Sequence, residues 1–207
     1  MNRGGAAAWA AGALVGVVVY VALDILLVFL RPEFSVLHNA ESDYGSKGAY
    51  AWVMDLNFLL RCALTLAVVR ALALAVTDRG RLRTGLGFLV AWAVASGLLA
   101  FFPDGPVGTT VQGAAKVHLL LALVAFVAVV VGTRIVTRAV GRDPAWKPVL
   151  GPLNVLSWGA IVPILLLGHA RLRPHSLGGL YEKIFLAMEL LWFTVAAFWV
   201  ARLDRVG

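Results

Sequence analysis

The chain has 207 residues, of which 61% are hydrophobic and only 14% are charged. Its mean hydropathy is +0.87, whereas soluble domains are about half apolar and a quarter charged. This composition excludes a soluble globule, a disordered chain and a disulfide scaffold. The formal net charge is +7, but in a membrane protein the basic residues first report orientation. No basic stretch is long enough to indicate a nucleic-acid partner.

Six apolar segments predict six transmembrane helices, because each approaches the roughly 20 residues that a helix needs to cross the hydrocarbon core. The alternation typical of a membrane β-barrel is absent. The expected fold is therefore all-α, a polytopic bundle of six helices, with residues 1–207 forming a single integral membrane domain. The segments are 7–30, 51–75, 85–102, 115–137, 150–168 and 181–201.

The distribution of Lys and Arg predicts the orientation. With the N-terminus inside, eleven basic residues fall in the inner loops and termini and six in the outer loops. Cytoplasmic loops are the richer in Lys and Arg, so we expect both termini to be cytoplasmic. The expected location is the cell (plasma) membrane, with the lipid bilayer as the first partner.

The first segment is too long for the 7–15 apolar residues of a signal peptide, so we interpret it as a transmembrane helix. It carries Gly12 and Gly16 one turn apart, a spacing that lets helices approach closely. This face packs either within the bundle or against a second copy, so an oligomer through Gly12 and Gly16 stays open.

The second segment carries Asn57 and Arg61 four residues apart, and the sixth carries Glu182 and Glu189 seven apart. Each pair therefore shares one helix face. Arg61 lies about 15 Å from the outer start of its helix and Glu189 about 12 Å from its own. Because an unpaired charge at mid-bilayer costs at least about 2.5 kcal/mol, we predict a buried Arg61–Glu189 ion pair. It would be either a clamp between helices or part of a polar pocket.

The third segment ends at Asp104, and His118 comes early in the fourth. A short hairpin would bring these side chains together on the outer side. A carboxylate that holds an imidazole is the minimum unit for general-base chemistry, so we predict Asp104 and His118 as catalytic residues. The alternative is that Asp104 caps the turn and His118 is an interfacial histidine.

Pro152 and Pro163 lie in the fifth segment and could kink it. The histidines lack the HxxxH and HExxH spacings of metal sites, so no metal site is predicted and the cofactor stays unknown. One thiol, Cys62, cannot form an internal disulfide, which argues against a membrane thiol oxidoreductase.

Several motifs mark the polar residues of the outer half. They are Ser42-Asp43-Tyr44-Gly45, Trp52-x-Met54-x-Leu56-Asn57-Phe58-x-x-Arg61, Phe102-Pro103-Asp104 followed by Gly113 and His118, Gly179-Leu180-x-Glu182-Lys183, and Glu189-Leu190-Leu191-Trp192. Together they resemble the prokaryotic family named domain of unknown function 998, over about residues 15–205. The resemblance implies a six-helix integral membrane protein without an established activity. Relatives often carry Phe-Pro-Thr-Asp at the third loop, where this chain lacks the threonine.

Two functions are open at this stage. The polar residues form either a site for a lipid or lipophilic small molecule, in an enzyme or a binder, or a cluster that only holds helices together in a structural or accessory subunit. In the first case the expected ligand-binding residues are Ser42, Asp43, Asn57, Arg61, Glu182 and Glu189.

Overall fold

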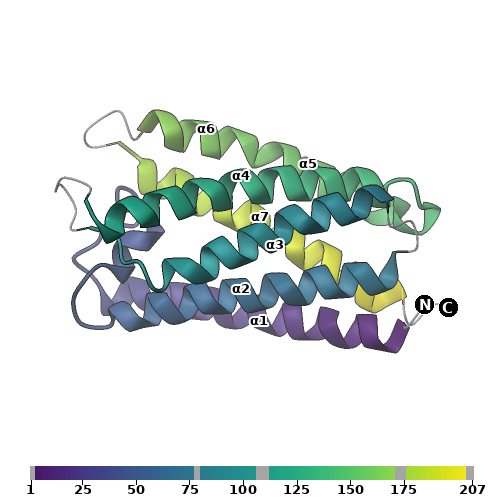
Figure 1. Ribbon diagram of the computed structural model, residues 1–207, viewed down its shortest axis with the longest axis horizontal. Helices are drawn as coiled ribbons and strands as arrows, with labels where there is room; N and C mark the ends of the chain where they lie inside the picture. The colour runs from purple at the N-terminus through teal and green to yellow at the C-terminus, as the bar shows by residue number, and fades with distance from the viewer. Residues whose placement is uncertain (1–2, 77–79, 106–111, 171–175, 204–207) are drawn as a thin grey trace.

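The computed structural model describes residues 3–76, 80–105, 112–170 and 176–203. Every regular element in these ranges is a helix (Figure 1). The elements are α1 (Arg3–Leu30), η1 (Glu41–Gly45), α2 (Ala51–Ala75), α3 (Gly80–Leu99), α4 (Ala114–Val140), η2 (Pro144–Trp146), α5 (Lys147–Gly159), α6 (Ile161–Ala170) and α7 (Gly178–Leu203).

Six helical stretches within the described ranges are long and apolar enough to cross a membrane. They are α1, α2, α3, α4, the α5–α6 pair and α7, with hydropathy between 1.5 and 2.8. The prediction of an all-α polytopic fold with six spans is thus confirmed. The chain is a multi-pass membrane protein. The largest boundary shifts are in the third span, which begins at Gly80 rather than 85, and in the fifth, which begins at Pro144 rather than 150.

The fifth span is broken into two helices. α5 ends at Gly159 and α6 begins at Ile161. Pro163 has no backbone N–H, so it cannot donate to the carbonyl four residues earlier, at Gly159. The predicted kink therefore forms at Pro163, whereas Pro152 lies inside α5 without ending it.

Spans that follow one another along the chain contact one another, and α7 also contacts α1, α2 and α4. The last span therefore packs against most of the bundle. The two chain termini lie at one end of the bundle together with η2, and η1 lies at the opposite end (Figure 1). We call these the terminal end and the distal end.

Glycines set the closest helix approaches. Gly85 of α3 lies against Val136 of α4, and Gly132 of α4 lies against Leu89 of α3, so the two helices meet through reciprocal contacts. Gly16 lies against Leu64 of α2, within the chain. Small residues allow such backbone approach in lipid, where packing drives helix association. Of the predicted Gly12/Gly16 face, Gly16 therefore packs within the chain, whereas Gly12 is exposed with open space around it.

The contact at Gly85 gives a stability prediction with a control on the same helix. A Cβ at Gly85 would lie 2.7 Å from Val136 Cγ2 and 3.0 Å from the Val136 backbone nitrogen, whereas one at Gly87 would meet nothing within 4 Å. Overpacking costs about 1–3 kcal/mol. We expect Gly85→Val to lower the thermal unfolding temperature in detergent and Gly87→Val to leave it nearly unchanged. Equal effects of the two variants would contradict this packing.

Candidate functional site

The segment between α1 and α2, residues 31–50, folds back onto the distal end of the bundle; we call it the distal loop. Arg31 is 4% exposed, and its Nη1 donates to the carbonyls of Tyr44 (2.8 Å) and Ser46 (2.9 Å). Its Nε donates to Glu33, 2.7 Å away, and this bond lowers the pKa of the exposed Glu33 carboxyl. Burial raises the pKa of the Tyr44 phenol.

The distal loop also docks onto the beginning of α7. The backbone N–H of Leu180 donates to the carbonyl of Leu37 at 3.0 Å. Gly179 lies so close to the backbone of Asn39 that a Cβ there would overlap it. Asp43 holds the turn itself, since its Oδ2 accepts from the Ala40 N–H at 2.8 Å and from Asn39 Nδ2 at 3.0 Å. The loop is therefore fixed at both its ends and its middle.

This docking places Glu41, the first residue of η1, inside the bundle. Arg61 Nη2 lies 2.7 Å from Glu41 Oε1, and the two side chains are 4% and 3% exposed. The same nitrogen donates to the Tyr20 hydroxyl at 2.7 Å, and that hydroxyl donates to Glu41 Oε1. We call Tyr20, Glu41 and Arg61 the buried triad; it joins α1, the distal loop and α2.

The predicted Arg61–Glu189 ion pair is wrong. Both carboxylate oxygens of Glu189 are buried without a hydrogen-bond partner among the described residues, and Arg61 pairs with Glu41 instead. The depth argument compared helices only, whereas the actual partner comes from a loop that enters the bundle. Glu41 directly precedes the Ser42-Asp43-Tyr44-Gly45 motif, so the residue that pairs with Arg61 lay just outside the motif. No sequence signal indicated Tyr20.

The predicted pairing of Asp104 with His118 is visible in the structure. His118 Nε2 lies 4.0 Å from Asp104 Oδ2, and His118 Nδ1 lies 2.6 Å from the carbonyl oxygen of Phe102. The other carboxylate oxygen of Asp104 accepts from the Gly105 N–H at 2.9 Å, so Asp104 also closes the turn. His118 is 3% exposed; it is a buried residue rather than an interfacial one.

The hydrogen bond at Nδ1 fixes the form of the His118 ring. A carbonyl oxygen only accepts, so Nδ1 must carry the proton and donate to Phe102. In the neutral ring Nε2 then holds the lone pair. Nε2 is buried and has no hydrogen-bond partner among the described residues. The histidine is thus held in the tautomer that a general base needs.

A cavity of about 340 Å³ lies beside His118 at the distal end. We call it the distal cavity. Its polar lining is Ser42, Arg61, Asp104, His118 and Glu182, and its apolar lining is Phe58, Leu99, Ala115, Leu119, Ala122 and Phe126. A concave site with a mainly apolar wall and a few converging polar groups is the usual form of a small-molecule site.

The distal cavity gathers five of the eight residues that the sequence singled out. Ser42 donates to Asp104 Oδ2 at 3.1 Å, and Glu182 is 4% exposed at the wall. Asp43, Asn57 and Glu189 do not line it. Asn57 is fully buried, and its side-chain nitrogen and oxygen have no hydrogen-bond partner in the part of the chain that the structure describes.

A second hollow, of about 410 Å³, lies between α1 and α7; we call it the α1–α7 crevice. Its polar lining consists of Tyr20, Asp24, Glu41, Lys183 and Thr194. The buried triad lies between the two hollows, because Tyr20 and Glu41 line the crevice and Arg61 lines the distal cavity.

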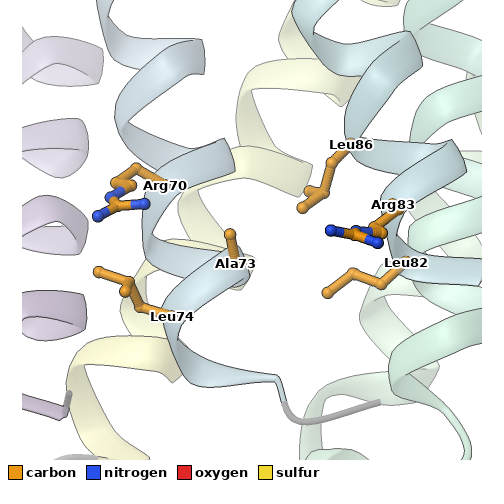
Figure 2. Close-up of a pocket in the computed structure, with 6 residues that line it drawn as sticks. All are labelled: Arg70, Ala73, Leu74, Leu82, Arg83 and Leu86. Carbon is orange, nitrogen blue, oxygen red and sulfur yellow. The ribbon is translucent and has the colours of Figure 1, made fainter. Parts of the chain in front are cut away.

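The terminal end carries a smaller pocket of about 210 Å³ between α2 and α3. Arg70 and Arg83 are its charged residues (Figure 2). Figure 2 shows their guanidinium groups apart, with the Arg83 side chain directed toward α2 and the Arg70 group on the other side of that helix. They do not converge on one point, so this pocket is not built like a single anion site. Among the described residues no group of three or more His, Cys, Asp and Glu is placed to hold a metal ion.

A family model described as "Protein of unknown function (DUF998)" matches residues 14–199. The matched region runs from the middle of α1 to near the end of α7, so it includes both hollows and the buried triad. No curated protein and no solved structure matches the chain.

The buried triad gives the second prediction. Arg61→Leu leaves the Glu41 carboxylate uncompensated in the interior, and breaking a buried pair in this way costs about 3–5 kcal/mol. The triple variant Arg61→Leu/Glu41→Leu/Tyr20→Phe removes all the polar groups at once, and we expect it to recover most of that loss. Arg70→Leu, at an exposed arginine of the same helix, is the control. Thermal unfolding in detergent measures all three; a triple variant as unstable as Arg61→Leu would contradict the pairing.

Proposed function

Since the chain belongs to the DUF998 family, whose members are described as proteins of unknown function, we propose a function from the distal cavity. The cavity binds a lipid or lipophilic small molecule, and His118 acts on it as a general base. The observation that carries this proposal is the His118 ring, with Nδ1 bonded to Phe102 O at 2.6 Å and Nε2 unbonded.

Asp104 suits the role of stabilising the base after proton transfer. Its Oδ2 lies 4.0 Å from His118 Nε2, so its charge favours the imidazolium that forms when Nε2 takes a proton. Ser42 donates its hydroxyl proton to the same Oδ2. This bond directs the serine proton to the carboxylate and supports water or a substrate hydroxyl, rather than Ser42, as the group that His118 deprotonates.

Arg61 supplies the complementary donor. Both of its hydrogen bonds within the buried triad use Nη2, and its Nε is buried without a partner among the described residues. A guanidinium carries five N–H donors, so the remaining donors suit a carbonyl or hydroxyl oxygen in the cavity. Glu41 already balances the charge of Arg61, and Asp104 lines the same wall, which disfavours an anionic group there. The best-fitting ligand is therefore an uncharged, oxygen-bearing lipophile.

The apolar wall matches such a ligand. Leu119, which is 52% exposed on α4, lines the cavity together with Phe58 and Phe126. Exposed leucine on a spanning helix faces lipid, so a lipophilic molecule has a route between bilayer and cavity that avoids water. The His118 base and the Arg61 donors then lie at the polar end of this route.

We also propose that the distal end faces outward and the termini lie in the cytoplasm. The described residues of the terminal end include the basic residues Arg81, Arg83, Arg138, Arg142 and Lys147. Cytoplasmic loops of membrane proteins are typically enriched in Lys and Arg. The distal cavity would then open on the outer side of the membrane.

A second candidate function is structural. The buried triad ties α1, α2 and the distal loop together, so the polar cluster would serve to hold the bundle in an accessory subunit. This alternative requires folding but no base at His118, and a variant that removes only the base separates the two functions.

His118→Asn is that variant. The Asn amide keeps a donor for Phe102 O but supplies no base, and loss of a general base slows catalysis by about 100-fold or more. We expect the purified variant to melt at nearly the wild-type temperature and to retain a lipophilic molecule that the wild type converts. Native mass spectrometry of both proteins measures it. His169→Asn, at an exposed histidine of α6, is the control. Identical co-purified molecules in all three proteins would favour the structural function.

The orientation has its own test. In a Cys62→Ala background, which removes the single native thiol, Ser35→Cys places a thiol on the exposed distal loop and Arg142→Cys places one at the exposed terminal end. A membrane-impermeant maleimide applied to intact cells should label Ser35→Cys, and label Arg142→Cys only after lysis. The reverse pattern would invert the proposed orientation.

A further inference from the structure

The α1–α7 crevice opens toward lipid. Val21 of α1 is 40% exposed and Leu191 of α7 is 53% exposed, and both line the crevice. Apolar side chains exposed on spanning helices contact acyl chains. The crevice is therefore a lateral opening that a membrane lipid can reach without leaving the bilayer.

Two groups of opposite charge line this opening at similar depth. Asp24 lies six residues before the end of α1 at Leu30, and Lys183 lies five residues after the beginning of α7 at Gly178. Each is therefore about 8–9 Å along its helix from the distal end. Both contribute to the lining of the crevice.

The two charges do not neutralise each other by contact. In the part of the chain that the structure describes, Asp24 makes no hydrogen bond or ion pair, and the ion pairs found are Arg31–Glu33, Arg61–Glu41 and Asp104–His118. Lys183 acts on Asp24 at longer range, while its Nζ donates to the carbonyl of Asn39 at 3.1 Å.

A carboxylate within a span is costly unless it finds a partner. Asp24 is only partly buried, so that partner can come from the crevice. Glu41 places a second carboxylate at the crevice. It is 2% exposed and lines the crevice, and both of its hydrogen bonds use Oε1. Its second carboxylate oxygen is thus not engaged by Arg61 or Tyr20.

We propose that the α1–α7 crevice binds the zwitterionic headgroup of a phospholipid, with its ammonium at Asp24 and Glu41 and its phosphate near Lys183. The acyl chains then lie along the exposed apolar residues between α1 and α7. This site is separate from the distal cavity and does not depend on the function proposed for it.

The charges of the crevice select against the other lipid classes. An anionic headgroup brings negative charge beside Asp24 and Glu41 and supplies no cation for Asp24. A purely cationic amphiphile satisfies the carboxylates but meets Lys183 with like charge. A headgroup that carries one ammonium and one phosphate complements both ends of the crevice, because like-charge contacts in low dielectric are expensive and opposite charges are favourable.

The test uses the purified full chain in mixed micelles with phosphatidylethanolamine and phosphatidylglycerol at equal concentration, read by native mass spectrometry. We expect phosphatidylethanolamine to be retained preferentially. Asp24→Asn should lower the ratio of retained phosphatidylethanolamine to phosphatidylglycerol by about tenfold, the effect of losing one charged hydrogen bond. Lys183→Gln removes the phosphate contact that both lipids share, so it should lower the retained amount of both lipids rather than their ratio. Asp55→Asn, at a carboxylate of α2 outside the crevice, and Lys116→Gln, at an exposed lysine of α4, are the matched controls and should leave the ratio and the retained amounts unchanged.

Two single-charge probes complete the experiment. Phosphatidic acid carries the phosphate alone and dodecylamine the ammonium alone, and we expect both to bind less well than phosphatidylethanolamine. Equal retention of phosphatidylglycerol or phosphatidic acid by the wild type would overturn the proposal, as would a wild-type ratio in Asp24→Asn or wild-type retention of both lipids in Lys183→Gln. Dodecylamine bound as tightly as phosphatidylethanolamine would overturn the role of Lys183. If Asp24→Asn fails to fold, Lys183→Gln and the two probes decide the outcome.

Discussion

The ion pair between Arg61 and Glu41 is the interaction on which the distal half of the molecule depends. A guanidinium in the middle of an apolar helix requires a counter-charge, and in the part of the chain that the structure describes Arg61 forms its ion pair with Glu41. The counter-charge comes from the distal loop, which must fold inward for Glu41 to reach Arg61. The requirement of one buried charge thus determines the position of a whole connecting segment.

The consequences of that inward loop reach both hollows. Because η1 carries Glu41 and Ser42 in succession, the residue that neutralises Arg61 also brings a hydroxyl to Asp104. Tyr20 completes the partition from the α1 side. One network therefore closes the wall between the cavity beside His118 and the crevice between α1 and α7. The polar groups are structural and site-forming at once, which explains why they concentrate at one end of the bundle.

The spans were predictable because hydropathy alone defines them. Residues 51–75 were expected as one helix and form α2 with the same bounds, and the missing N–H of Pro163 made the kink in the fifth span foreseeable. The contact between Asp104 and His118 also followed from local connectivity, since the two residues lie near the ends of two consecutive helices, α3 and α4. These features depend on composition or on residues near one another in sequence.

The partner of Arg61 was not predictable on the same grounds. The depth of a residue along a helix can be calculated from the sequence, because a helix rises regularly. The path of a 20-residue connection cannot be predicted in this way, because a loop has no regular geometry. Glu41 looked like one acidic residue of an exposed loop, and Tyr20 like an aromatic residue in an apolar helix. Glu189 was predicted as the partner from its depth along α7, but depth does not determine which side of the helix faces Arg61. Only tertiary packing settles such pairings.

The contact between the distal loop and the beginning of α7 fixes an order of assembly. The loop leaves the ribosome after the first span, but Gly179 and Leu180, against which it rests, belong to the last. Glu182, which completes the wall of the distal cavity, is also made last. During synthesis the first five spans must therefore stay in the bilayer with the loop undocked. The wall of the distal cavity is complete only when the final helix inserts, so a chain that lacks this helix lacks the closed cavity.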